Sequence, residues 1–309
     1  MTRSRRFLWA FGLAFVASTA LAASQSPVTA EARSGARAKS PAKATAKAST
    51  KAPAKVSATA KGPAKKTVST PAPKLPKMTA ERIVERNVAA RGGLGAWRAV
   101  NTLTMSGRLD AGGKPTVELP FVMKLKRGHK SRLEVAFKDQ TAVQIYDGSQ
   151  GWKVRPFLNR DQVEPYTEAE ARSAAGWEEL DGPLIDCAAK GTKVELVGTE
   201  SVEGKPTYKL RLTFKSGEQR HVWIDGKSFL ERKMEGEPRK LDGKLRAVAI
   251  HYREFGTDRG LTTPRVLETV VDGVKSTHKL TITKVAVNVP MPDSLFGKPQ
   301  LASIGVPAR

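Results

Sequence analysis

The feature that most limits the fold is a nine-residue run, Val117 to Leu125, in which apolar and polar side chains alternate. Val117, Leu119, Phe121, Met123 and Leu125 occupy every second position. Alternation with a period of two places one set of side chains on one face of a β-strand. A strand that is apolar on one face and polar on the other is typical of antiparallel sheets, because parallel strands are usually covered on both faces.

The same alternation returns along the rest of the chain. It is found around Leu103, Met105 and Leu109, and again at Leu133, Val135 and Phe137. Later strands are expected in KVELVG, YKLRLTF, HVWID, FLERKM, LRAVAIHY, PRVLETVV and HKLTITKVAV. Turn sequences separate the earlier runs, namely AGGK (111–114), KRGHK (126–130), KDQ (138–140) and YDGSQG (146–151). This spacing predicts a meander of about a dozen antiparallel strands.

Helices are expected in two regions only. Thr79 can cap the first, Gly92 can end it, and TEAE (167–170) is a capping box that opens the second. Asp181, Gly182 and Pro183 should interrupt the second region. The predicted helices are Ala80–Arg91, Leu94–Val100, Thr167 to about Leu180, and Leu184–Lys190.

A sheet of this size curls, and its apolar side must be covered. Tyr208, Leu210, Leu212 and Phe214 alternate with polar residues, so one face is apolar and the other is wet. The helical segments contain few apolar residues in comparison with the sheet face that they must cover. The sequence therefore favours an apolar cavity under a helical lid, with an ordinary filled core as the alternative.

The N-terminus has the layout of a secretory signal peptide. Arg3, Arg5 and Arg6 precede an uncharged apolar run from Phe7 to Ala22, which ends in small residues suited to cleavage before Ala23. The run of 16 residues is shorter than the roughly 20 that a membrane-spanning helix needs. Residues 1–22 are thus predicted to be removed on export, and no cysteine near the cleavage site could carry a lipid anchor. We expect a soluble periplasmic protein.

Residues 23–77 form a basic tail. Ala, Lys, Pro, Ser and Thr dominate it, and ten lysines and two arginines stand against Glu31 alone. Such a composition cannot bury enough apolar surface to fold, so a disordered linker is expected. The tail accounts for about half of the net charge of +23 and could bind an anionic membrane surface or cell-wall polymer. A solvated spacer is the alternative, and export argues against nucleic acid as a partner.

The remaining chain, residues 78–309, is long enough for one domain with a sizeable core. Cys187 is the only cysteine, which excludes an internal disulfide and a cysteine-rich metal site. His129, His221, His251 and His278 are scattered without metal-ligand spacing, although two of them could approach each other in the sheet. GxSxG and HExxH motifs are absent. The sequence therefore predicts no enzyme, no cofactor and no metal.

The order of motifs resembles that of the LolA-like outer-membrane lipoprotein-sorting proteins. The resemblance runs from residue 80 to 298 through ARGGLGAWRAVNTLTMSGRL, YDGSQGWKVRPF, VGTESVEGKPTYKLRLTFKSGE, HVWID and NVPMPDSLF. It implies a strongly curved, incomplete antiparallel barrel closed by helices, whose apolar cavity shields acyl chains in the periplasm. In that family an arginine at a strand end fastens the lid. Arg127 stands at the matching position, but Gly128 replaces the family's proline.

The candidate site follows from the alternation and from the resemblance. Residues predicted to line the cavity are Val117, Leu119, Phe121, Met123, Leu125, Leu133, Val135, Phe137, Tyr208, Leu210, Leu212 and Phe214. Residues predicted for the lid are Arg127, Trp177, Leu180, Leu184 and Ile185. The predicted function is a monomeric, non-catalytic carrier of acyl chains or of lipoprotein anchors. The alternative is an envelope-binding protein held at anionic polymers by its tail.

Overall fold

The computed structural model describes residues 75–300 except 111, 113–115, 157–159 and 178–179. The predicted signal peptide and the predicted linker up to residue 74 lie outside the described residues. At the start of the described chain, Leu75 packs against Tyr208 and its apolar neighbours, and the Tyr208 hydroxyl donates to the Pro76 carbonyl oxygen at 2.8 Å. The last residues of the expected linker thus contact the folded domain.

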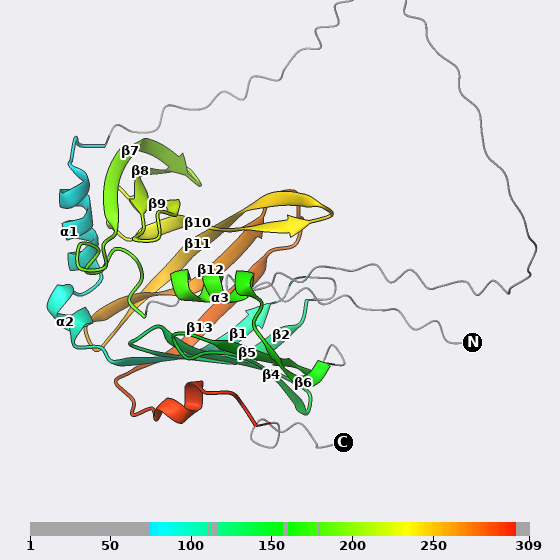
Figure 1. Cartoon of the computed structure of the whole chain (residues 1–309). Coiled ribbons are helices and arrows are strands. Elements are labelled where there is room, and N and C mark those ends of the chain that lie inside the picture. Colours follow the sequence, from blue (N-terminus) through cyan, green and yellow to red (C-terminus); the bar gives the residue numbers. More distant parts are fainter. Residues whose placement is uncertain (1–74, 111, 113–115, 157–159, 178–179, 301–309) are drawn as a thin grey trace, which may run out of the picture. The chain divides into compact units, whose positions relative to one another are not determined.

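A single antiparallel sheet of thirteen strands forms most of the described structure (Figure 1). The strands are β1 Thr102–Asp110, β2 Glu118–Lys126, β3 Lys130–Phe137, β4 Gln140–Tyr146, β5 Gly151–Arg155, β6 Arg160–Pro165, β7 Lys193–Val202, β8 Lys205–Thr213, β9 Gln219–Asp225, β10 Glu231–Leu241, β11 Lys244–Asp258, β12 Leu261–Val271 and β13 His278–Val287. Their order is β6-β5-β4-β3-β2-β1-β13-β12-β11-β10-β9-β8-β7. The edge strands β6 and β7 are not paired with each other, so the barrel is incomplete. The predicted fold class is confirmed.

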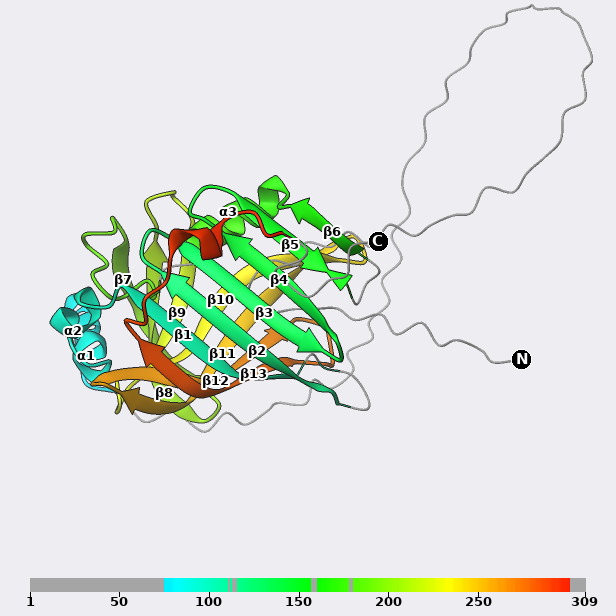
Figure 2. The ribbon, with the colours of Figure 1, turned by 90° about the horizontal axis from the view of Figure 1, so that it is seen from below.

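The first and last strands meet in the middle of the sheet. Leu103 of β1 lies opposite Val287 of β13, while every other neighbouring pair is consecutive in the chain. Figure 2 shows the broad sheet that results, with β1 to β4 on one side of this junction and β11 to β13 on the other. A bulge at Ser106 and Gly107 interrupts the β1–β13 register. A Cβ atom on Gly107 would overlap the Thr281 carbonyl oxygen, so this close approach requires glycine.

Three α-helices accompany the sheet among the described residues: α1 Ala80–Ala90, α2 Leu94–Arg98 and α3 Glu168–Trp177. Each agrees with a predicted helix to within about three residues at either end. The Thr79 hydroxyl accepts from the backbone N–H of Arg82 at 3.3 Å, as predicted. The capping box is also present, because Glu170 N donates to Thr167 Oγ1 at 3.3 Å while Thr167 N donates to Glu170 Oε2 at 2.7 Å.

The fourth predicted helix, Leu184–Lys190, is wrong, because this segment is a series of turns. Asp186 has a φ of +55°, in the left-handed region that a right-handed helix excludes. Its carboxylate accepts two hydrogen bonds from Arg98 of α2, at 2.7 and 2.9 Å. A tertiary ion pair therefore accompanies a backbone conformation that the local sequence does not indicate.

Two hydrophobic clusters hold the sheet in its curved shape. The larger lies along β1, β2, β3 and β13 and includes Trp97 of α2. The smaller lies under α1, where Ala80 and Ile83 pack on β8, β9 and β10. A short 3₁₀-helix, η2 Asp293–Phe296, packs its Phe296 on β4 and β5. The two larger clusters face the same interior, and the space between them is where a cavity can exist.

Candidate ligand-binding site

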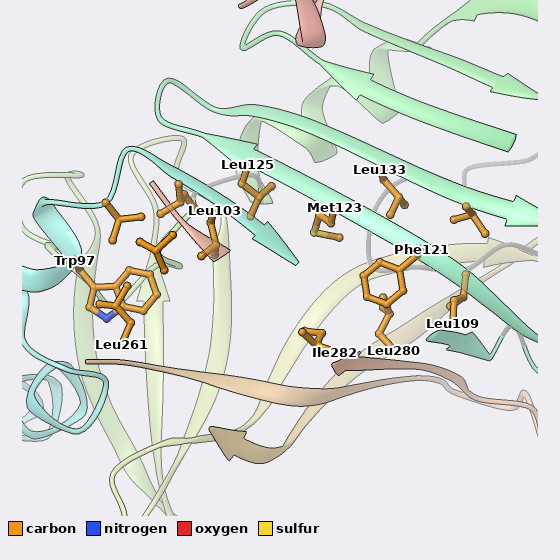
Figure 3. Close-up of a cluster of buried hydrophobic side chains, with 14 of the residues drawn as sticks. Trp97, Leu103, Leu109, Phe121, Met123, Leu125, Leu133, Leu261, Leu280 and Ile282 are labelled. Atoms are coloured by element: carbon orange, nitrogen blue, oxygen red, sulfur yellow. The ribbon is translucent and has the colours of Figure 1, made fainter. Parts of the chain in front are cut away.

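An apolar cavity of about 200 Å³ lies between these two clusters. One wall is Leu103, Met105, Met123 and Leu125 from β1 and β2, and Leu280 and Ile282 of β13 continue it. Figure 3 shows Met123 and Leu125 on β2, Leu280 and Ile282 on β13, and Trp97 at the α2 end. The remaining lining residues are Arg91, Leu180, Asp181, Gly182, Pro183, Leu184, Val222, Glu231, Met234, Ile250, Tyr252, Thr263, Pro264, Leu267 and Thr269. The cavity is therefore enclosed mainly by alternate residues of the sheet.

Residues 180–192 cover one side of this cavity, and we call them the roof loop. Leu180 to Leu184 contribute directly to the lining. Asp181 is the centre of its attachment. Arg127 Nη1 donates to Asp181 Oδ2 at 2.9 Å and Lys190 Nζ to Oδ1 at 2.5 Å, while Arg91 Nη1 donates to the Asp181 carbonyl oxygen at 2.9 Å. Three cations thus converge on one residue, which is 3 % exposed at its side chain.

Polar atoms at the cavity wall are concentrated around Arg91. Its guanidinium lies 4.6 Å from the centre of the Trp97 ring and 3.4 Å from Glu231 Oε1. The Trp97 Nε1–H in turn donates to the Arg91 carbonyl oxygen at 2.9 Å. Arg91 Nε and Thr263 Oγ1 are buried, and neither finds a hydrogen-bond partner within the described part of the chain. Buried polar groups normally have partners, so the Arg91 Nε–H can donate to a ligand atom, and the Thr263 hydroxyl can donate or accept.

Burial also affects Tyr252, which lines the same cavity. Desolvation raises the pKa of its phenol, so the hydroxyl stays protonated. It donates to Met234 Sδ at 3.7 Å, a weak interaction that leaves the cavity surface close to neutral. Such a lining is suited to enclosing a hydrocarbon segment rather than to acid–base chemistry.

A second cavity, of about 530 Å³, adjoins the first across the roof loop. Gly182, Pro183 and Met234 belong to the lining of both. Its other lining residues are more polar and include several cations: His129, Arg172, Ala175, Lys190, Thr192, Phe214, Lys215, Ser216 and Glu218. The roof loop therefore separates an apolar space from a basic one.

The structure distributes the predicted lining residues over four places. Met123 and Leu125 border the apolar cavity, and Phe214 borders the second cavity. Six others extend the larger cluster along the sheet, namely Val117, Leu119, Phe121, Leu133, Val135 and Phe137. Tyr208, Leu210 and Leu212 are buried under α1, where Ile83 and its neighbours fill the space. Their contact with a ligand stays a prediction.

The predicted lid residues gather around the roof loop. Leu180 and Leu184 line the apolar cavity, and Ile185 is fully buried in the larger cluster. Arg127, in the turn between β2 and β3, reaches Asp181 as described above and also donates from Nη2 to the Trp97 carbonyl oxygen at 2.5 Å. The side chain of Trp177 lies outside the described residues.

Several lining residues were missed at the sequence level. Val222, Ile250, Leu267 and Ile282 come from strands that were predicted, and the alternation in those strands is the signal that could have found them. Arg91, Glu231 and Asp181 have no comparable signal. Only the folded chain brings these three charged groups together, since they come from α1's end, β10 and the roof loop.

The histidines do not form a common site. His221 of β9 and His251 of β11 lie on strands separated by β10, and each is near its own glutamate. His221 Nδ1 is 2.9 Å from Glu235 Oε2, and His251 Nδ1 is 3.3 Å from Glu203 Oε1. Among the residues that the structure describes, no three His, Cys, Asp or Glu side chains lie close enough to hold a metal ion. Of the described helices, none is long and apolar enough to cross a membrane.

Known proteins resemble this chain at the level of fold. No family model matches the sequence, and no curated protein matches it either. Among solved structures, a LolA superfamily protein from Nitrosomonas europaea is 16 % identical with a TM-score of 0.47, over 72 % of this chain and 99 % of that one. A LolA superfamily protein, the family that the sequence resembles, is thus among the solved structures similar to this chain.

Two further structures are similar to the same extent. A DUF1329 family protein from Desulfovibrio piger is 13 % identical with a TM-score of 0.48, over 73 % of this chain and 98 % of that one. A domain described as an outer-membrane lipoprotein-sorting protein, from Vibrio parahaemolyticus, is 12 % identical with a TM-score of 0.46, over 70 % and 95 %. These similarities concern the fold alone.

Proposed function

We propose that this chain is an exported, non-catalytic carrier that holds an acyl chain, or the lipid anchor of a lipoprotein, for transport toward the outer membrane. The observation that carries the proposal is the apolar cavity beneath the roof loop, lined by alternate residues of seven strands. Burying a methylene group contributes about 0.8 kcal/mol, so hydrocarbon is the ligand class that such a lining favours. The fold of the LolA-like proteins is consistent with this assignment.

The volume of the cavity limits what it can hold as it stands. An apolar cavity of about 150 Å³ is enough to bind benzene. At about 200 Å³ this cavity accommodates a segment of an acyl chain rather than its whole length. A long chain would need either a displaced roof loop or an extension past Gly182 and Pro183 into the second cavity. The ion pairs of Asp181 would then compete with ligand for the position of the loop.

Co-purification tests the carrier directly. The mature protein is isolated from the periplasmic fraction under mild conditions, and bound lipid is identified by mass spectrometry. The delipidated protein is then titrated with acyl ligands, and a ligand at 100 times its Kd should raise the free energy of unfolding by about 2.7 kcal/mol. A protein that carries no lipid or lipoprotein, and gains no stability from acyl ligands, is not a carrier.

A second candidate function is attachment to an anionic envelope surface through the basic tail. The observation that favours it is the charge of residues 23–77, where twelve cations stand against one acid. Deleting residues 23–72 leaves Leu75 and Pro76 in place against the domain. Loss of envelope binding by this variant, with unchanged folding by circular dichroism, supports the tail as an anchor; retained binding excludes it. Sedimentation of the same samples tests the expected monomer.

A further inference from the structure

The second cavity differs from the first in charge. Its lining contains Arg172 of α3, Lys190 of the roof loop and Lys215 of the β8–β9 turn, with His129 nearby. Among the described residues, Glu218 is the single acid in that lining, and Arg220 Nη2 lies 2.5 Å from its Oε1. The space beside the apolar cavity therefore carries a local excess of positive charge.

Two of these cations are available to a ligand. Lys215 is exposed and forms no ion pair within the described part of the chain. Arg172 lies 3.5 Å from Glu168, and both side chains are largely exposed, so that pair is weak. Lys190 is different, because it holds Asp181 Oδ1 and the Gly182 carbonyl oxygen of the roof loop. Lys215 and Arg172 are the groups that an anion could recruit without disturbing the loop.

The order of the two cavities matches the order of groups in a charged lipid. Hydrocarbon would occupy the space lined by Met123, Leu125 and Ile282, and Gly182 and Pro183 mark the boundary. Beyond that boundary the lining turns basic. Lysine and arginine bind phosphate oxygens through charge-assisted hydrogen bonds, which are stronger than those to neutral acceptors.

We propose that the ligand is an amphiphile with a phosphate-bearing, anionic headgroup, whose acyl segment lies in the apolar cavity and whose phosphate lies in the second cavity beside Lys215 and Arg172. This inference rests on the proposed carrier function and names its ligand class. A neutral diacylglycerol satisfies the apolar cavity equally well but leaves these cations without a partner. The two lipids therefore differ only in what the second cavity recognises.

Uptake from mixed vesicles tests the headgroup. The full mature chain is incubated with vesicles that contain phosphatidylglycerol and diacylglycerol with identical acyl chains in equal amounts. The protein is separated by gel filtration, and its bound lipids are quantified by mass spectrometry. Because both lipids come from one vesicle, attraction of the basic tail to the surface affects both alike. We expect phosphatidylglycerol to be enriched about fivefold or more.

Substitutions locate the preference. Lys215→Gln combined with Arg172→Gln should abolish most of the enrichment while leaving uptake of diacylglycerol unchanged. The control is Lys205→Gln, since Lys205 is also an exposed lysine but lies at the start of β8 and does not line either cavity. Retention of the enrichment by the double variant, or its loss in the control, overturns the proposal.

Stability measurements with inorganic phosphate distinguish a site for a lipid headgroup from a site for free phosphate. If phosphate stabilises the wild type but not the double variant, and neither lipid is preferred, the second cavity is a site for free phosphate and the lipid assignment is wrong. Equal uptake of both lipids with no effect of phosphate also overturns the headgroup, yet leaves the acyl carrier intact. Uptake of neither lipid removes the carrier function itself.

Discussion

Arg127 joins the β2–β3 turn to the roof loop through its bond to Asp181, with Nη1 and Oδ2 2.9 Å apart. The Asp181 side chain is 3 % exposed, while that of Arg127 is 37 % exposed. The same arginine donates to the Trp97 carbonyl oxygen at 2.5 Å. One side chain therefore ties together the turn, the helix α2 and the loop that covers the cavity.

Arg127→Gln should loosen the roof loop. The substitution removes a charged hydrogen bond to a buried carboxylate. We expect this loss to destabilise the closed loop by about 1 kcal/mol, which shifts the equilibrium toward the open loop roughly fivefold. Hydrogen exchange of residues 180–192 should become faster, and a bound acyl probe should dissociate faster. Arg108→Gln is the control, because Arg108 is exposed on β1 and forms no ion pair among the described residues. Unchanged exchange and dissociation would mean that Arg127 does not hold the roof loop closed.

Two glycines close together in the sequence should respond to alanine in opposite ways. Gly92 has a φ of +110°, and a Cβ atom there would overlap the Gly260 carbonyl oxygen. Gly92→Ala should lower the free energy of unfolding by more than about 2 kcal/mol. Gly95 lies in α2 with no atom near its Cβ position. Gly95→Ala should raise the free energy of unfolding by about 0.5 to 1 kcal/mol. Urea unfolding of both variants measures the difference, and similar effects would contradict this account of Gly92.

The strands could be predicted because their evidence is local. Period-two alternation within a few residues indicates strands such as β2 and β8, and the capping box of Thr167 and Glu170 is contained within four residues. The pairing of β1 with β13 could not be predicted in this way. Leu103 and Val287 are far apart in the chain, and the sequence of neither strand indicates which strand pairs with it.

The candidate site could be predicted only in part for the same reason. Alternation shows which residues face the interior, but the placement of α1 decides which of them are covered by protein. Ile83 fills the space under Tyr208 and Leu210, whereas Met123 and Leu125 face open volume. Within the roof loop, Leu184–Lys190 was predicted as a helix, but Asp186 takes a left-handed conformation and pairs with Arg98, a tertiary contact that the local sequence does not indicate.

Acid should weaken the attachment of η2 to the sheet. Hydrogen bonds from Lys126 and then Lys130 lower the pKa of Asp293 from its ordinary 3.8 to about 2. A lowered pKa in the folded state means that the ionised carboxylate favours folding. Its contribution is complete above pH 3.8 and is lost as the pH falls toward about 2. The difference in unfolding free energy between wild type and Asp293→Asn should therefore shrink over this range.

Asp139→Asn is the control for that experiment, because Asp139 is exposed and forms no ion pair in the described structure. Its difference from wild type should change little over the same pH range. If Asp293→Asn behaves like this control, the two lysines do not hold η2 through the carboxylate. Protection of residues 293–296 in hydrogen exchange gives a second, local measurement of the same loss.

Filling the apolar cavity should abolish ligand binding without unfolding the protein. Leu267 of β12 lines the cavity and is only partly buried, so a larger side chain can enter the open volume. Leu267→Trp should cost about 1 to 3 kcal/mol of stability from overpacking. Its more informative effect is on ligand binding, because acyl compounds should no longer raise the free energy of unfolding.

Leu245→Trp, at a side chain that is 72 % exposed, is the control and should respond to ligand as the wild type does. Leu267→Phe adds a graded step in case the tryptophan variant does not fold. The stabilisation by ligand should fall from leucine to phenylalanine to tryptophan, and full stabilisation of both variants would mean that acyl chains bind elsewhere.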